Sequence, residues 1–481
     1  MSILTYLLTA LWPLHSAALP SQASAVPSIP HNSLSRATNE TTIFWSNCTG
    51  LKTKLNLECA NITVPLDWDR RSSHENITLA LARIPCTEPA SRVGTLVFNP
   101  GGPGEGAIGS LGVFSDNIKK YFDLVAMDPR GTGRSDKFKC PRRQFFCPKG
   151  FPQTETEYEA LANVARDLEA VRIALGEGKL NFVGFSYGAQ LAVTYAELFP
   201  TNFRAMMIDG VSDNTVSQLE TSMRHVNGYR EGFERFATWC DSSLACMLHG
   251  RHVHKILDQA LVKAGDDANC LSDNLAMWII EGWWGALAER LAIAAGEDDI
   301  VARYSSRLMA TFSDLPKRPS YTYNYTELSP PCESHVQSER ARMAHIAVHC
   351  LDAPLTSPSL SDFTQQQRII DASNSSLKDF GADKELAATC IGWPFPPRNP
   401  SHRLNFSVEI PPILVVNSLH DYRTPYAGAV NIQNQLPSSV LLTTKVNSHC
   451  SYDYEGSPAT SVMEEYMING KLPVPGTVLD T

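Results

Sequence analysis

The residues best suited to chemistry in this sequence form the short run Gly184-Phe185-Ser186-Tyr187-Gly188. An apolar stretch, residues 180–183, precedes it and a helical pattern, residues 189–199, follows it. This arrangement predicts a strand, a sharp turn and a helix, with Ser186 at the apex. Glycines on both sides let strand and helix approach closely, and the helix N-terminus favours negative charge beside the hydroxyl. The pattern therefore predicts a serine nucleophile.

A serine hydroxyl is a weak nucleophile, so it needs a general base and an acid that orients the base. The last histidine of the chain, His449, follows the final predicted strand, and Asp421 follows the strand before it. We therefore predict a triad of Ser186, Asp421 and His449. Two alternatives stay open. Asp209, at the end of an earlier predicted strand, is the rival acid, and His420 is a less natural base because it adjoins the acid.

Main-chain amides are the expected donors to an oxyanion beside Ser186. One is the amide of Tyr187, and the other is assigned to Gly102 in the loop Asn99-Pro100-Gly101-Gly102-Pro103-Gly104. Gly102 is chosen because close approach of the backbone to the oxyanion requires a residue without a side chain. A second glycine-rich loop, residues 128–133, is expected to be a structural turn held by a pair between Asp128 and Arg130.

The rest of the chain predicts a mostly parallel sheet flanked by helices, because short apolar strands alternate with helical patterns. Strands are predicted at residues 59–65, 77–83, 95–98, 124–127, 180–183, 205–208, 413–416 and 439–446. Helices are predicted at 154–175, 189–199 and 427–436, and residues 463–468 lie in a closing helix. A helix-rich stretch interrupts the strands, which indicates an α/β fold with a large helical cap inserted after the sixth core strand. The expected units are residues 1–25, a signal peptide; 26–213, the first part of the core; 214–404, the mainly helical cap; and 405–481, the C-terminal part of the core.

Three features predict passage through a secretory pathway. Residues 3–14 form an apolar segment too short for a comfortable membrane span, and cleavage is expected near Ala25 or Ala18. The twelve cysteines make an even count, and proximity suggests the pairs Cys48–Cys59, Cys240–Cys246 and, more loosely, Cys350–Cys390. Seven N-x-S/T sequences are candidate glycosylation sites, at Asn39, Asn47, Asn61, Asn76, Asn324, Asn374 and Asn405.

Charge and metal-ligand spacing limit the partners. The net charge of −9 argues against a nucleic-acid partner, since phosphate binding needs a basic face. His249, His252 and His254 lie close in sequence, but no cysteine or acid at suitable spacing completes a metal site. We therefore expect no metal and no other cofactor, and no stable membrane association once the signal peptide is removed.

The quoted motifs resemble those of a known family. The loop at 99–104, the run Asp128-Pro129-Arg130-Gly131-Thr132-Gly133-Arg134-Ser135, the turn around Ser186, Asp421 with Thr424-Pro425, and His449-Cys450 are similar to the tripeptidyl aminopeptidase-like branch of the α/β-hydrolases, a group related to the prolyl aminopeptidases. The resemblance covers nearly the whole mature chain and implies a secreted serine exopeptidase with the same three catalytic residues. Glu105 departs from the small residues usual in the family, and it either narrows the pocket or offers a carboxylate to a substrate amine.

Three functions are compatible with these residues. The leading one is a secreted serine hydrolase that releases short peptides or single residues from free N-termini through an acyl-enzyme on Ser186. The second keeps this machinery but acts on a small ester, lactone or secondary metabolite, because one fold supports many chemistries. The third is a hydrolase-like binding protein, which the presence of all three catalytic residue types disfavours.

Overall fold

The described part of this computed structural model comprises residues 43–51, 55–69, 75–136, 161–265, 271–272, 275–276, 278–279, 282–297, 299–300, 339–352, 360–373, 390, 400–452 and 457–480. The predicted signal peptide and the predicted start of a helix at residue 154 lie outside these ranges.

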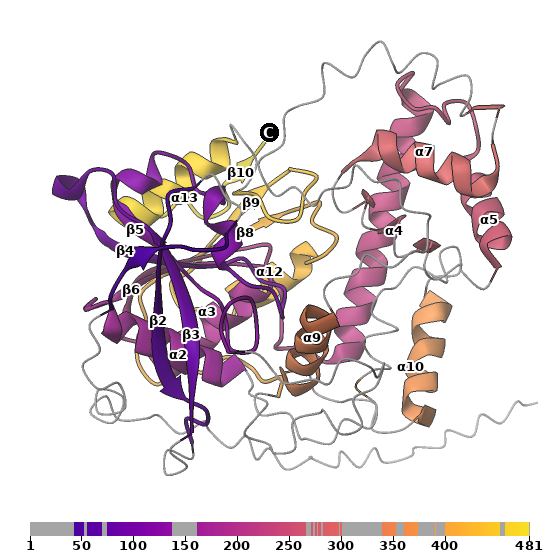
Figure 1. Ribbon diagram of the computed structural model, residues 1–481. Coiled ribbons are helices and arrows are strands. Elements are labelled where there is room, and N and C mark those ends of the chain that lie inside the picture. Colours follow the sequence, from indigo (N-terminus) through magenta and orange to yellow (C-terminus); the bar gives the residue numbers. More distant parts are fainter. Residues whose placement is uncertain are drawn as a thin grey trace, which may run out of the picture.

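A ten-stranded sheet forms the centre of the molecule (Figure 1). Its strand order is β1-β2-β3-β5-β4-β6-β7-β8-β9-β10. The bounds along the chain are β1 Ser46–Asn47, β2 Glu58–Pro65, β3 Asn76–Ile84, β4 Gly94–Asn99, β5 Phe122–Met127, β6 Leu180–Phe185, β7 Phe203–Asp209, β8 Ile413–Ser418, β9 Val440–Thr444 and β10 Val478–Leu479. All pairs from β5 to β10 are parallel, and only the pairs that involve β1, β2 and β3 are antiparallel. The predicted mostly parallel sheet is confirmed, and its parallel strands end at one common edge, where such sheets place their sites.

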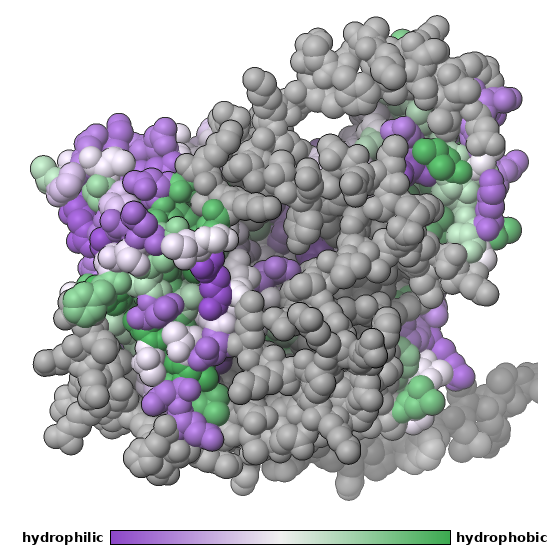
Figure 2. All heavy atoms as spheres, viewed as in Figure 1, coloured by the Kyte–Doolittle hydropathy of each residue, from purple (hydrophilic) through white to green (hydrophobic). Residues whose placement is uncertain are grey.

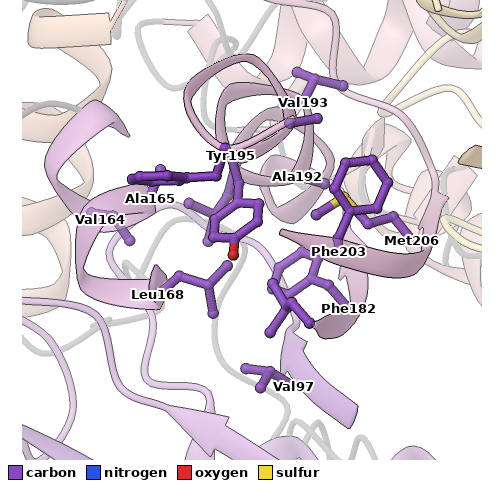
Figure 3. Close-up of a cluster of buried hydrophobic side chains, with 14 of the residues drawn as sticks. Val97, Val164, Ala165, Leu168, Phe182, Ala192, Val193, Tyr195, Phe203 and Met206 are labelled. Atoms are coloured by element: carbon purple, nitrogen blue, oxygen red, sulfur yellow. The ribbon is translucent and has the colours of Figure 1, made fainter. Parts of the chain in front are cut away.

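Helices cover both faces of the sheet. Three helices pack on one face and one on the other: α2 Leu161–Ala174, α3 Tyr187–Leu198 and α12 Tyr426–Gln433, opposite α13 Pro458–Asn469. Figure 3 shows the first of these faces, where Leu168 of α2 and Ala192 of α3 meet Phe182 and Phe203 of the strands. Every residue of β4, β6 and β8 is buried, which explains why these strands read as continuous apolar runs rather than as alternating patterns.

The described chain between β7 and β8 contains helices and no strand, in agreement with the expected helix-rich stretch. Its helices are α4 Gln218–Ser242, α5 Val253–Ala264, α7 Trp284–Ala295, α9 Glu339–Asp352 and α10 Leu360–Ser373. They lie to the right of the sheet in Figure 1, with α9 beside the core. Helices α4, α5 and α7 share an apolar cluster of their own, which includes Phe233, Leu257 and Leu291. The cap boundaries at residues 214 and 404 stay predictions.

All three suggested disulfides are present, Cys48–Cys59, Cys240–Cys246 and Cys350–Cys390. The first ties the residue after β1 to β2 at the edge of the sheet, and the third ties α9 to residue 390. Cys86 and Cys450 are thiols. The other cysteines lie outside the described residues.

The described surface mixes hydrophilic and hydrophobic residues, as Figure 2 shows for one face. Exposed apolar side chains occur singly, for example Val262 on α5 and Phe44 before β1. Four candidate glycosylation sites are exposed, namely Asn47, Asn61, Asn76 and Asn405, whereas Asn39, Asn324 and Asn374 lie outside the described residues. Among the helices that the structure describes, none has the length and apolar character needed to cross a bilayer.

Candidate active site

Ser186 lies on a strained turn between β6 and α3. Its φ of 56° is in a region that residues with side chains rarely adopt, and its amide donates to the main-chain oxygen of Asp209 at 2.9 Å. A Cβ on Gly184 would lie 2.3 Å from the carbonyl oxygen of Gly188, so only glycine allows strand and helix to cross here. The sequence therefore builds the predicted turn, with Ser186 at its apex.

The predicted acid and the predicted base meet at the same edge of the sheet. Asp421 follows β8 and His449 follows β9, and the imidazole Nδ1 lies 2.9 Å from Oδ2 and 3.1 Å from Oδ1 of Asp421. Asp421 is buried, and it also accepts hydrogen bonds from the amide and the hydroxyl of Thr424 at 2.9 and 2.7 Å. Asp421 thus orients the His449 ring through Nδ1, in the way a general base requires.

These contacts also set the charge of Asp421. Burial alone would raise the pKa of this carboxyl, but the charge of His449 and the hydrogen bonds from His449 and Thr424 outweigh burial and lower the pKa below its ordinary value. Asp421 is therefore ionised at neutral pH and can stabilise an imidazolium.

The serine turn and the Asp–His pair meet at the end of β7. A Cβ on Gly210 would lie 3.1 Å from Cε1 of His449 and 3.2 Å from Oδ2 of Asp421. The preceding residue, Asp209, holds the amide of Ser186. The structure therefore brings the three predicted catalytic residues to neighbouring strand ends.

The two alternative residues have other environments. The carboxyl of Asp209 accepts amides of residues 451 and 452, whereas the carboxyl that contacts His449 belongs to Asp421. His420 is half-buried; burial, together with the positive charges of Arg235 and Lys445, lowers its pKa to about 4. Among the described residues its Nδ1 has no hydrogen-bond partner.

The loop after β4 packs against the serine turn, and the residue in closest contact is Gly101. A Cβ there would lie 2.5 Å from the carbonyl oxygen of Phe185 and 2.8 Å from Cβ of Ser186, whereas one on Gly102 would meet only its own loop, at 3.2 Å. The amide of Gly101, however, already donates to Oδ1 of Asn99 at 2.9 Å. The steric demand that singled out a glycine thus applies to Gly101, while the choice of Gly102 as donor stays a prediction.

Helix α9 contacts both this loop and the first residue of α3, which no sequence pattern indicated. Nδ1 of His345 lies 3.0 Å from the carbonyl oxygen of Pro103, and the phenol of Tyr187 donates to Oδ2 of Asp352 at 3.0 Å. Burial, and then the negative charge of Asp352 and the hydrogen bond to it, raise the pKa of Tyr187 well above its ordinary value. No motif marks His345 or Asp352, because their partners are distant in sequence and the helical pattern alone gives no docking site.

A pocket adjoins the serine turn, between the loops after β4 and β5 and helix α9. Its lining includes Glu105, Arg130, Tyr187 and Val348. Glu105 is half-buried, and burial raises the pKa of its carboxyl. The pocket therefore offers an acidic side chain close to the residue that follows Ser186.

The expected Asp128–Arg130 pair is wrong. Arg130 instead forms a two-pronged ion pair with Asp167 of α2, with N–O distances of 2.6 and 2.7 Å. Asp128 accepts the amides of Ile108 and Arg134 at 2.9 and 2.7 Å. The turn is thus held by main-chain amides, and the arginine joins it to α2, a contact that local sequence cannot reveal.

The histidines at 249 and 254 contact separate partners rather than one common group. His249 contacts the carbonyl oxygen of Cys240 at 3.0 Å, and His254 pairs with Glu234 at 3.0 Å. Within the described ranges, no group of three or more histidine, cysteine or acidic side chains is placed to hold a metal ion.

Comparison with known proteins agrees with this geometry. The model of the alpha/beta hydrolase fold family matches residues 94–455, a stretch that contains the serine turn, the Asp–His pair and the helices between them. The chain belongs to the α/β hydrolase fold family.

Curated relatives of this α/β hydrolase carry more than one activity name. A serine protease, Hip1, of Mycobacterium tuberculosis is 28% identical, and the match covers 90% of each chain. Carboxylesterase B of the same species is 27% identical over 86% of this chain and 85% of the relative. A tripeptidyl aminopeptidase of Streptomyces lividans is 25% identical over 86% of this chain and 82% of the relative.

Proposed function

We propose that this α/β hydrolase is a serine peptidase that releases short peptides or single residues from free N-termini. The observation that carries the proposal is the buried Asp421–His449 pair, at 2.9 Å, beside the strained turn of Ser186. The names of the relatives Hip1 and tripeptidyl aminopeptidase support a peptide as the substrate.

In the proposed reaction, Ser186 attacks the acyl carbon while His449 accepts the hydroxyl proton. His449 then delivers this proton to the leaving amine, and a water molecule hydrolyses the acyl-enzyme in a second cycle of the same steps. Asp421 fixes the ring through Nδ1 and stabilises the imidazolium that forms. Each proton transfer uses a group of this chain, so the reaction requires no metal or other cofactor.

The oxyanion is proposed to bind the amides of Tyr187 and Gly102. Tyr187 opens α3, so its amide points out of the helix start at the residue after the nucleophile. Gly102 is preferred to Gly101 because the amide of Gly101 is already bonded to Asn99. Such amides act on the charge that develops in the transition state and are worth about 3–4 kcal/mol each.

Glu105 is proposed to receive the free amine of the substrate. It lines the pocket together with Tyr187, so an amine held there would lie close to the oxyanion donors, as release of a single N-terminal residue requires. Burial disfavours the ionised form of the Glu105 carboxyl group. A substrate ammonium group beside this carboxyl would stabilise the ionised form. This pairing would make a free N-terminus a requirement for tight binding.

A second candidate function is carboxylic ester hydrolysis, possible on the same three residues. The relative named carboxylesterase B supports it. An ester substrate, including a lactone or a secondary metabolite, would need the triad and the oxyanion donors but no acidic partner for an amine.

We also propose that the protein is exported and glycosylated. The disulfides Cys48–Cys59, Cys240–Cys246 and Cys350–Cys390 favour an oxidising compartment, and four acceptor asparagines are exposed. The apolar segment at residues 3–14 would then act as the signal for export.

The proposal is tested by assaying the full chain and its Ser186→Ala variant on matched substrates. These are tripeptidyl and single-residue anilides with free or blocked N-termini, and short-chain nitrophenyl esters. We expect hydrolysis of the free-amine anilides that is lost on blocking and on mutation. Ester cleavage alone, still dependent on Ser186, would favour the second candidate. Equal activity of variant and wild type on every substrate would overturn the mechanism.

A further inference from the structure

Asp209 is a completely buried carboxyl group that the proposed reaction does not use. It is the last residue of β7, which lies between β6, carrying the serine turn, and β8, carrying the acid. A buried ionisable side chain is costly unless its surroundings hold it, so its contacts indicate what it does.

Asp209 contacts both halves of the catalytic centre. Its Oδ2 accepts the amides of Ser451 and Tyr452, at 2.7 and 2.8 Å, in the segment that follows His449. Its main-chain oxygen accepts the amide of Ser186 at 2.9 Å. One residue thus holds the serine turn by its backbone and the segment after His449 by its side chain.

The segment that carries His449, residues 445–452 and here called the histidine loop, needs such support. It follows the end of β9 at Thr444, and Cys450 has a φ of 67°, which is rare for a residue with a side chain. Two amides in succession that donate to one carboxylate oxygen can fix this conformation, because the oxygen sets the position of both peptide planes. The position of the His449 ring then depends on Asp209 as well as on Asp421.

We propose that Asp209 is a positioning residue of the catalytic centre. It is a buried carboxyl group, in addition to that of Asp421, that fixes the histidine loop relative to the serine turn. This inference rests on the proposed function, since it assumes that Ser186 and His449 react together. It assigns Asp209 no contact with the substrate.

The surroundings of Asp209 explain why Asn is the informative replacement. Within the described residues its Oδ1 has no hydrogen-bond partner, so an Asn side chain can keep its oxygen on the two amides. The titratable groups that face it are Asp421 and His449. Burial raises the pKa of Asp209 to about 7, in spite of the two amides, so a neutral side chain is close to its natural state at neutral pH.

The test uses a fluorophosphonate probe, which reacts with an activated serine whatever the natural substrate is. The full chain is compared with Asp209→Ala, Asp209→Asn, Asp421→Asn and Ser186→Ala. The final extent of labelling counts the competent sites, and the rate of labelling reports the reactivity of each site. Thermal unfolding is measured on every variant.

We expect Asp209→Ala to lower the labelling rate per competent site by about 100-fold, the loss that a misplacement of about 1 Å can cause. On the substrate found for the wild type, kcat should fall while KM stays within about twofold, because the residue does not touch the substrate. Asp209→Asn should restore most of the rate. A purely structural role would change the unfolding temperature but leave the rate per competent site unchanged.

Asp67→Ala is the matched control. Asp67 is also buried and also accepts a main-chain amide, that of Asp69 at 2.7 Å. It follows β2, which β3, β5 and β4 separate from β6. This variant should lose stability but label at the wild-type rate.

The outcomes separate the two proposals. A wild-type labelling rate in Asp209→Ala, beside a slow Asp421→Asn, would overturn this inference and leave the proposed function intact. A severe loss in both Asp209 variants with normal unfolding would also overturn it, because the side chain would then act by its charge rather than by positioning. Labelling that survives in Ser186→Ala would overturn the proposed function instead.

Discussion

The phenol of Tyr187 donates a 3.0 Å hydrogen bond to Oδ2 of Asp352, so the residue after Ser186 is joined to helix α9. Both side chains are buried. The same helix contacts the loop after β4 through His345 and Pro103. The two proposed oxyanion donors, Tyr187 and Gly102, are therefore both held from outside the core sheet, by a helix inserted between β7 and β8.

Removing the hydroxyl group of Tyr187 should test its connection to Asp352 of α9. Tyr187→Phe deletes one hydrogen bond to a buried carboxylate, and we expect a loss of about 1.5–3 kcal/mol in the free energy of unfolding. The labelling rate of Ser186 should fall as well. The side chain of Tyr187 would no longer be held by Asp352, so the main-chain amide of the same residue, a proposed oxyanion donor, would be less well fixed. Chemical denaturation and fluorophosphonate kinetics measure the two effects. Asp352→Asn, whose oxygen can still accept the bond, should be milder in both, and equal effects would argue against the anchor.

The close packing of Gly101 gives a steric prediction. Gly101→Ala places a Cβ 2.5 Å from the carbonyl oxygen of Phe185 and 2.8 Å from Cβ of Ser186, so the serine turn or the loop must shift. We expect labelling of Ser186 to fall at least 100-fold, as for other displaced catalytic groups. The control is Gly109→Ala, because a Cβ on Gly109 would meet no atom within 4 Å. If Gly109→Ala proved as harmful as Gly101→Ala, packing on the serine turn would not be the deciding difference.

A Glu105 variant should affect substrates with a free N-terminal amine more than substrates without one. Glu105→Gln keeps the size of the side chain but cannot hold a negative charge, so KM for free-amine anilides should rise by about tenfold or more, the equivalent of about 1.4 kcal/mol. Steady-state kinetics on free-amine anilides and on short-chain nitrophenyl esters provide the measurement. The KM for the esters, which carry no amine, should not change. A similar rise for all substrates would mean that Glu105 shapes the pocket instead.

The pKa of Asp209 predicts a pH dependence of stability. The folded protein holds this proton more tightly than the unfolded chain does, since burial raises the pKa from 3.8 to about 7. The corresponding stabilisation is fully present below about pH 4 and is lost as the pH rises to about 7. Asp209→Asn lacks this loss, so its unfolding temperature relative to wild type should increase from pH 4 to pH 8. Parallel curves for the two proteins would contradict the raised pKa.

The sequence predicted those parts of the molecule that local patterns determine. The turn around Ser186 is encoded by its own glycines, and Asp421 and His449 stand directly after apolar strands, so topology alone places them at one edge. The contacts that were missed depend on distant partners. Arg130 pairs with Asp167 of α2, and Tyr187 with Asp352 of α9, and neither pair leaves a trace in local spacing.

Local sequence patterns also could not predict the shortest strands or the exact position of the glycine beside Ser186. The strands β1 and β10 have two residues each, and both form by pairing with a neighbouring strand. Choosing between Gly101 and Gly102 required the distance to Ser186, because both residues are glycines in the same loop. The cap contained no strand pattern, so its helical character was readable, but the docking of α9 was not.

The pairing of β7 with β8 has a consequence for synthesis of the chain. Met206 lies opposite Ile413, so the strand beside the serine turn gains its second neighbour only after the whole helical segment has been made. A nascent chain that ends before residue 413 would carry the proposed nucleophile but neither the proposed acid nor the proposed base, and it would expose an apolar strand edge suited to aggregation. The proposed catalytic centre is therefore completed last, when the C-terminal strands close the sheet, and one edge of β7 stays unpaired until then.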